Sequence, residues 1–140
     1  MPRCALLLGL ALALLSCASL PPAPARVAPD WSALASEETI QLLTQDPDGD
    51  IRETTVWLVV VDGIGTIRTG NASWYANLTR DPTLKVRMGG LEYPMRIERV
   101  TDEETRRRIN SVFRAKYGVQ DRTVQLFRGV DLYMLHLLPR

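Results

Sequence analysis

The stretch IRETTVWLVVVDG at residues 51–63 decides the fold. β-Branched and aromatic side chains dominate it, and the turn dipeptide Asp62-Gly63 closes it. From Val56 to Val61 both alternating sets of side chains are apolar. Because successive side chains of a strand point to opposite faces, this pattern predicts one strand that is covered on both faces and lies centrally in a sheet.

Shorter strand signals lie on both sides of this stretch. The acidic segment DPDGD at 46–50 joins it to an apolar strand before it, and the pair predicts a hairpin. Alternation around Gly89-Gly90 predicts a second hairpin, and a third is expected to turn at Arg128-Gly129. The expected strands outside the central one cover residues 39–44, 64–69, 84–88, 91–97, 123–127 and 130–138.

A short helix is predicted after residue 70. Asn71 is a suitable N-cap, and Trp74 and Leu78 share one face at a spacing of four residues. Asp81-Pro82 ends the helix because proline cannot continue it. Trp74 is therefore expected to point inward.

The clearest helix signal follows residue 100. The sequence TDEE at 101–104 has the spacing of a capping box, apolar side chains then recur at helical intervals, and Gly118 closes the element. Six or seven mainly antiparallel strands with two helices predict a small β-barrel of the α+β class. The roughly 110 residues available suffice for one such core and not for two.

The first 16 residues have the order of a signal peptide. One positive residue, Arg3, precedes an uninterrupted apolar run from Ala5 to Leu15. The run of roughly eleven residues is shorter than the roughly twenty that a membrane-spanning helix needs. We expect residues 1–16 to be cleaved from the chain.

The sequence LLSC at 14–17 resembles the bacterial lipobox, in which the cysteine becomes diacylated. Acyl chains on Cys17 anchor a protein stably, because each buried methylene contributes about 0.8 kcal/mol. Cleavage by ordinary signal peptidase near Ala18-Ser19 is the alternative. Under the first interpretation residues 17–30 form a lipidated, Pro/Ala-rich linker and residues 31–140 form the domain. The protein is then anchored to the cell envelope and faces the periplasm.

Composition excludes several classes of function. The formal net charge of +1 gives no basis for a nucleic-acid partner. Cys4 leaves with the signal peptide and Cys17 carries lipid, so the domain has no thiol for catalysis or metal binding. The single histidine, His136, lies in an apolar strand, where packing is favoured over a role as a haem ligand. We therefore predict neither catalytic side chains nor a metal site.

Four motifs occur in an order that resembles the flavin-binding split-barrel superfamily. They are VWLVVVDG, RTGNASWYANLTRDP, VRMGG and DEETRRRINSVFRAKYG, within residues 38–118. The likeness is to a family of small uncharacterised domains that end a helix in R-x-K-Y-G. It extends more distantly to deazaflavin-dependent nitroreductases with a W-Y-x-N-L-x-x-x-P segment. The resemblance implies a split barrel and, as in many members, a homodimer.

The resemblance also implies a cofactor and the residues that hold it. Members with known activity bind FMN, a deazaflavin or sometimes haem, and the flavin types transfer hydride or electrons. The residues implied to flank a ring system are Thr54, Thr55, Val56 and Trp57. Those implied to approach a phosphate or ribityl chain are Arg68, Thr69, Gly70 and Asn71. Further candidates are Trp74 and, with weaker support, Arg96, Lys116 and Tyr117.

The sequence departs from the deazaflavin enzymes at one turn. The turn that is basic and holds phosphate in those enzymes here carries Asp46, Asp48 and Asp50, which repel an anionic cofactor. Export of an unfolded chain also means that a flavin has to be acquired outside the cytoplasm. Two hypotheses stay open. One is a lipid-anchored oxidoreductase or cofactor carrier, and the other is a cofactor-free barrel that binds a small ligand or a protein at the envelope.

Overall fold

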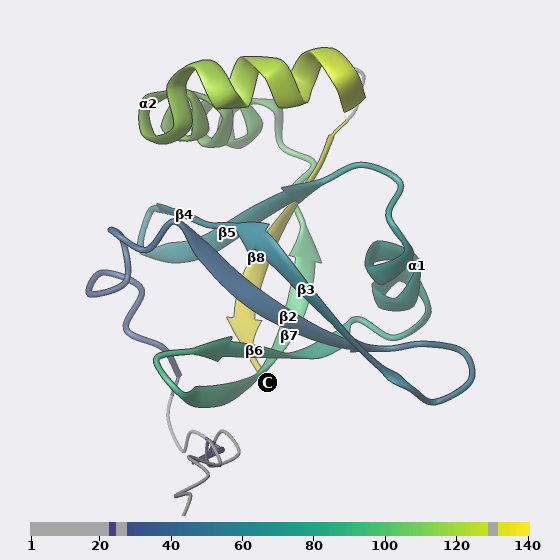
Figure 1. The fold of residues 1–140 in the computed structure, drawn as a ribbon. Helices are drawn as coiled ribbons and strands as arrows, with labels where there is room; N and C mark the ends of the chain where they lie inside the picture. The colour runs from purple at the N-terminus through teal and green to yellow at the C-terminus, as the bar shows by residue number, and fades with distance from the viewer. Residues whose placement is uncertain (1–22, 25–27, 129–131) are drawn as a thin grey trace, which may run out of the picture.

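The computed structural model describes residues 23–24, 28–128 and 132–140. Seven antiparallel strands form a curled half-barrel accompanied by two helices, which confirms the predicted α+β class (Figure 1). The elements are β1 (Ala23–Pro24), β2 (Thr39–Gln45), β3 (Ile51–Trp57), β4 (Val59–Val61), β5 (Ile64–Thr69), α1 (Ser73–Arg80), β6 (Thr83–Met88), β7 (Leu91–Arg99), α2 (Glu103–Arg128) and β8 (Tyr133–Pro139). The two-residue β1 pairs with β7 in parallel.

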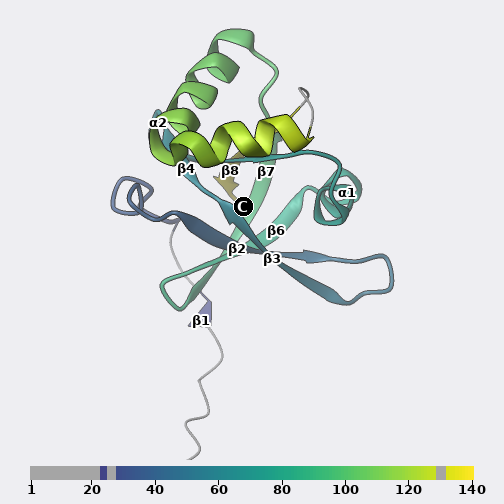
Figure 2. The ribbon, with the colours of Figure 1, turned by 45° about the horizontal axis from the view of Figure 1, so that its top comes forward.

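The strands are ordered β3-β2-β6-β7-β8-β5-β4 in a single sheet. Two predicted hairpins are present, as β2–β3 and β6–β7. Gly89 and Gly90 both have positive φ in the second turn, where residues with a side chain are strained. Figure 2 shows α2 lying over β4, with α1 well separated from it.

The predicted central strand is in fact two strands. It breaks at Leu58, whose amide N–H donates to the carbonyl of Glu38 (3.0 Å) and to the hydroxyl of Tyr117 (3.1 Å). β3 and β4 lie at the two ends of the strand order, so the predicted central position is wrong. Both sets of side chains are apolar because they serve two cores: Val56 packs against the half-barrel cluster, and Val59 belongs to the cluster beneath α2.

Two apolar clusters hold these elements together. The first fills the half-barrel, and its fully buried members include Leu42, Leu58, Ile67, Met95 and Leu135. The second joins α2 to β4 and β8 through Val59, Val61, Ile109, Phe113, Tyr117 and Met134. Full burial of one such Leu or Phe side chain contributes about 1.5–3 kcal/mol. The second cluster therefore fixes α2 beside the place where the half-barrel stays open.

α1 buries the side chains that the sequence assigns to its inner face. Trp74 is 7% exposed and Leu78 is 2% exposed. The predicted cap is wrong, because the helix starts after Ala72 with no side-chain cap, and Asn71 is exposed. The helix ends at Arg80 with Asp81 as its C-cap, because Pro82 cannot continue it.

α2 begins as the sequence predicts and continues beyond its predicted end. The Asp102 carboxylate caps it by accepting the amide N–H of Thr105 at 2.8 Å. Gly118 has φ 54° and ψ −122°, so the helix kinks there and resumes. The kink turns the second half of the helix toward β5, where Asp121 meets Arg68.

The strand predicted over 123–127 is consequently wrong, because these residues are helical. Its alternation spans only five positions, and a tertiary contact of the same helix half overrides so short a pattern. Only the second strand of the predicted last hairpin is present, as β8 between β5 and β7. The expected turn residue Gly129 lies outside the described residues.

The expected signal peptide at 1–16, Cys17 and most of the linker also lie outside the described residues. Within the described ranges, no helix is both long enough and apolar enough to span a bilayer.

Gly118→Ala should destabilise the protein. Its φ and ψ lie in a region that is nearly reserved for glycine, and forcing another residue there costs about 1–3 kcal/mol. Gly70→Ala is the matched control, because a Cβ at Gly70 meets no atom within 4 Å and φ there is not positive. Urea unfolding followed by circular dichroism measures both variants. Equal unfolding midpoints would show that the kink is not strained.

Candidate functional site

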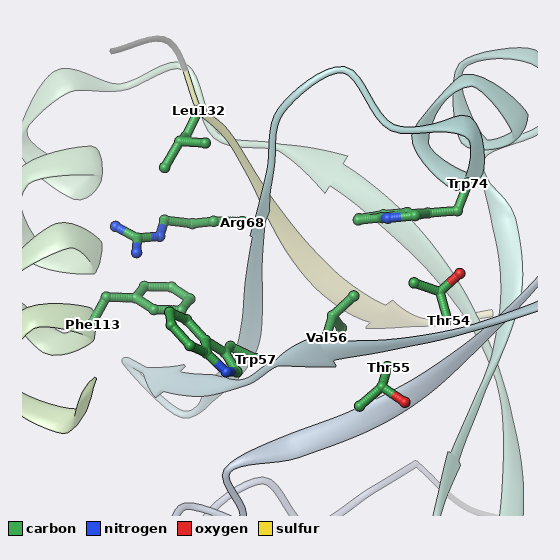
Figure 3. A pocket seen from close by; sticks show the side chains of 8 residues that line it. All are labelled: Thr54, Thr55, Val56, Trp57, Arg68, Trp74, Phe113 and Leu132. Carbon is green, nitrogen blue, oxygen red and sulfur yellow. The ribbon is translucent and has the colours of Figure 1, made fainter. Parts of the chain in front are cut away.

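A cavity of about 210 Å³ lies among β3, β5 and the two helices. Its lining residues are Thr54, Thr55, Val56, Trp57, Arg68, Trp74, Phe113 and Leu132 (Figure 3). In that view Trp57, Arg68 and Phe113 group on the side of α2, and Trp74 lies on the side of α1. The lining thus combines five aromatic or aliphatic residues with two threonines and one arginine.

Aromatic packing sets the orientation of the rings around the cavity. The Trp57 ring stacks on Tyr117 of α2, with centroids 4.6 Å apart and planes 8° from parallel. Tyr117 in turn packs against Phe113 at 5.7 Å. One face of Trp57 is therefore covered by Tyr117, while the residue as a whole stays half-buried at the cavity.

Arg68 is the cation in the cavity wall, and its charge is compensated. Its side chain is 4% exposed and forms an ion pair with Asp121, which is fully buried. One guanidinium nitrogen donates to the Asn110 side-chain oxygen at 2.8 Å, and the guanidinium carbon lies 3.8 Å from the centroid of the Phe113 ring. Burial lowers the pKa of Arg68, and the hydrogen bond to Asp121 opposes this shift. The cavity wall is therefore close to electroneutral.

The structure brings six of the nine candidate residues together in this cavity: Thr54, Thr55, Val56, Trp57, Arg68 and Trp74. The other three lie apart from it. The Thr69 hydroxyl is buried and donates to the Gly70 carbonyl at 3.0 Å. Asn71 is exposed and lines a separate hollow with Tyr75, Arg99 and Tyr133. Arg68 and Asn71 thus line different hollows, and cofactor binding by the nine candidates stays a prediction.

The weaker candidates on α2 hold the helix in place. The Lys116 ammonium donates to the carbonyl oxygens of Ala35, Glu37 and Leu58, the last at 2.9 Å. The Tyr117 hydroxyl lies 2.6 Å from the Leu58 carbonyl oxygen. Both residues therefore fasten α2 to the link between β3 and β4.

Desolvation shifts the pKa of both groups: it lowers the pKa of Lys116 and raises that of Tyr117 to about 12. The remaining weak candidate, Arg96, is exposed and lies 3.7 Å from Glu98. It takes no part in the cavity lining.

Three residues of the site escaped the sequence analysis. Phe113 and Leu132 carry only the periodic signal of core residues, which Phe113 shares with Tyr117 one helical turn later. Asp121 carried no signal, because its role depends on the kink at Gly118. The Asp121 carboxylate could be placed beside Arg68 only once the helix kink at Gly118 was known.

The acidic turn contributes no residue to the cavity lining, although it ends four residues before the lining residue Thr54. Asp46 forms an ion pair with Arg52 at 2.7 Å and accepts from the Asn77 amide at 2.7 Å. The turn lies at the end of β3 opposite Trp57, about 20 Å away for a strand of this length. Its charge therefore does not belong to the cavity wall.

His136 is likewise engaged elsewhere. Its Nδ1 lies 2.9 Å from the Thr66 hydroxyl across the β5–β8 ladder, and burial lowers its pKa. In the part of the chain that the structure describes, no three His, Cys, Asp or Glu side chains gather in a way that suits a metal ion.

Residues 30–128 match a protein family described as "Uncharacterized protein conserved in bacteria (DUF2255)". The chain belongs to this family. No curated protein matches the DUF2255 chain in sequence.

Three solved structures resemble the DUF2255 chain. Conserved hypothetical protein Rv2991 from Mycobacterium tuberculosis is 20% identical, with a TM-score of 0.63 over 81% of this chain and 82% of that chain. HutZ from Vibrio cholerae, described as a haem storage protein, is 16% identical, with a TM-score of 0.63 over 83% and 92%. A putative pyridoxamine 5'-phosphate oxidase from Listeria innocua is 16% identical, with a TM-score of 0.59 over 79% and 90%. At these identities the likeness shows the fold alone, which is a split barrel.

Asp121→Asn should destabilise the DUF2255 domain by about 3 kcal/mol or more, because it leaves the buried Arg68 guanidinium without its counter-charge. Adding Arg68→Met should recover most of this loss, since a buried pair is often replaced by apolar side chains at little cost. Glu104→Gln is the control: it breaks the exposed pair with Arg108 and should cost less than about 0.5 kcal/mol. Chemical denaturation measures all three, and similar losses for Asp121→Asn and Glu104→Gln would contradict the buried pair.

Tyr117 should make the stability of the domain fall at alkaline pH. Its pKa is raised from 10.0 to about 12, so the fold favours the neutral phenol. The contribution is complete below pH 10 and is lost as the pH rises from 10 toward 12, because the unfolded state releases this proton first. Unfolding midpoints of the wild type and Tyr117→Phe, measured from pH 8 upward, should converge in this interval. A constant difference would contradict the raised pKa.

Proposed function

We propose that the domain is a binding module of the cell envelope that holds a small, uncharged ring in the cavity beside Trp57. The observation that carries this proposal is the pairing of Arg68 with Asp121, in a lining whose other residues are aromatic, aliphatic or threonine. An apolar site with a few fixed polar groups is the usual character of a small-molecule site.

The size of the cavity supports a ligand with one ring. About 150 Å³ of apolar cavity holds benzene, whereas sites for drug-sized ligands span about 300–1,000 Å³. The cavity, at about 210 Å³, lies between these cases and nearer the first. Trp57 and Trp74 offer aromatic surfaces on opposite sides of the cavity, and aromatic side chains favour contact with a ring.

The residues present do not fit a phosphate-bearing flavin cofactor. A phosphate needs an uncompensated cation or a set of free N–H groups. The one cation in the described cavity lining, Arg68, is neutralised by Asp121, and only its Nε–H has no hydrogen-bond partner. The Thr69 hydroxyl donates to the Gly70 carbonyl, and Asn71 lies in another hollow. The acidic turn, expected to repel the cofactor, contributes no residue to the lining, so its effect on an anionic cofactor stays a prediction.

Haem is not supported by the cavity either. A haem iron needs an axial His, Cys, Met or Tyr, and none of these is among the described lining residues. The haem storage and oxidase descriptions of two similar structures therefore support the fold of this chain and not its ligand.

The location at the envelope is part of the proposal. The apolar run before Cys17 and the lipobox-like LLSC support export and a lipid anchor, with the domain facing the periplasm. A homodimer, which the resemblance implies, stays a prediction that sedimentation velocity tests.

Isothermal titration should detect binding of toluene and not of benzoate, because the cavity offers no free cation to a carboxylate. FMN should bind no more tightly than lumiflavin, which lacks the phosphate. Val56→Phe should abolish toluene binding by filling the cavity. Ile51→Phe introduces the same side chain on the same strand, at a position that is 59% exposed, and it should leave toluene binding intact. Binding of benzoate or a strong preference for FMN would contradict a neutral site.

Metabolic labelling with an alkyne fatty acid tests the anchor in a bacterial host. Wild type and Cys4→Ala should be labelled and should sediment with membranes, whereas Cys17→Ala should be neither. The two variants are matched, since each removes one of the two cysteines of the chain. Labelling of Cys17→Ala would refute lipidation at this cysteine.

A further inference from the structure

Thr55 contributes to the cavity in an unusual way. It belongs to the lining, yet Figure 3 shows its side chain pointing away from the other lining side chains, and the residue is exposed. Its neighbours Thr54 and Val56 point their side chains toward the cavity. What Thr55 presents to the cavity is therefore its main chain.

Two hydrogen bonds fix the direction of the main-chain groups in β3. The Asp46 N–H donates to the Asp50 carbonyl at 2.8 Å, and the Leu58 N–H donates to the Glu38 carbonyl at 3.0 Å. These bonds bracket the β2–β3 ladder and continue its register. Bonded and non-bonded pairs alternate in an antiparallel ladder, so even-numbered residues of β3 bond to β2. Thr55, at an odd position, directs its N–H and C=O away from β2.

That edge of β3 has no partner strand in the described chain. β3 ends the strand order, and its only ladder is with β2. β4, at the other end of the order, packs beneath α2 through Val59 and Val61. Thr55 is exposed, so its outward main-chain groups can bond to water and remain available to a ligand that replaces this water. The open edge therefore offers one donor and one acceptor, side by side, to a ligand in the cavity.

We propose that the ligand carries a cyclic secondary amide, whose N–H donates to the Thr55 carbonyl and whose C=O accepts the Thr55 N–H. This proposal rests on the proposed function, because it names the chemistry of a ligand at the same cavity. The exchange of two bonds reproduces the pairing that a neighbouring strand makes. The ring that contains the amide lies against Trp57, on the face that Tyr117 leaves free. Six-membered lactams and ureides have the required size and edge.

The ligand pair 2-pyridone and N-methyl-2-pyridone tests the proposal on the wild-type protein. The two rings are nearly equal in shape, and only 2-pyridone has the amide N–H. We expect 2-pyridone to bind about ten-fold more tightly in isothermal titration, as the loss of one well-placed hydrogen bond implies. Equal affinities would overturn the amide proposal. Toluene separates the two claims: if toluene binds as well as 2-pyridone, the ring cavity stands and amide recognition fails. If none of the three rings binds, the ring-binding function itself fails.

Thr55→Pro provides the test on the protein side. Proline removes the outward N–H without removing a bond to β2, and edge strands tolerate proline in this orientation. The ten-fold preference for 2-pyridone should disappear, whereas Thr55→Ala, which keeps the amide, should retain it. Circular dichroism checks that both variants are folded. If Thr55→Pro does not fold, the comparison of 2-pyridone with N-methyl-2-pyridone on the wild-type protein tests the amide proposal alone. A folded Thr55→Pro that keeps the preference would overturn the proposal.

Discussion

The buried ion pair between Arg68 and Asp121 is the contact on which the arrangement of the cavity depends. It joins β5 to the second half of α2 across an apolar region, where a charge without a partner is strongly unfavourable. The pair requires the kink at Gly118, because a straight helix would carry Asp121 away from β5. β5 and α2 also line the cavity, so the same ion pair fixes the shape of the cavity and neutralises the charge in its wall.

The R-x-K-Y-G motif at residues 114–118, which helped to reveal the resemblance to split barrels, has a structural explanation. Lys116 and Tyr117 bind the carbonyl of Leu58, at the break between β3 and β4. Gly118 then kinks the helix. In this chain the motif therefore positions α2 and covers one face of Trp57, and neither polar side chain lines the cavity.

Much of the fold was readable from the sequence, because alternation and turn residues are local signals. The β2–β3 and β6–β7 hairpins, and the inward direction of Trp74, follow from such patterns. The break at Leu58 could not be predicted in this way, because the apolar run is uninterrupted. The break accompanies a tertiary contact, in which the Leu58 N–H donates to the Tyr117 hydroxyl of α2. The helical state of 123–127 also depends on tertiary contacts.

The candidate site was likewise predicted from the sequence only in part. Thr54 to Trp57 and Arg68 were proposed from the resemblance, and the structure brings them to one cavity. The resemblance also implied that Thr69 to Asn71 approach a phosphate or ribityl chain, but the chain leaves β5 at that point and carries Asn71 to a separate hollow. The compensation of Arg68 by Asp121 required the fold. It changes the expected ligand from an anionic cofactor to a neutral ring.

Nuclear magnetic resonance of the isotope-labelled protein with 2-pyridone tests the central claim, that this neutral cavity is the ligand site, most directly. We expect intermolecular Overhauser effects from the ring protons to the Thr55 amide proton and to the Trp57 indole ring. Overhauser effects confined to Tyr75 and Tyr133 would place the ligand in the other hollow and contradict the account.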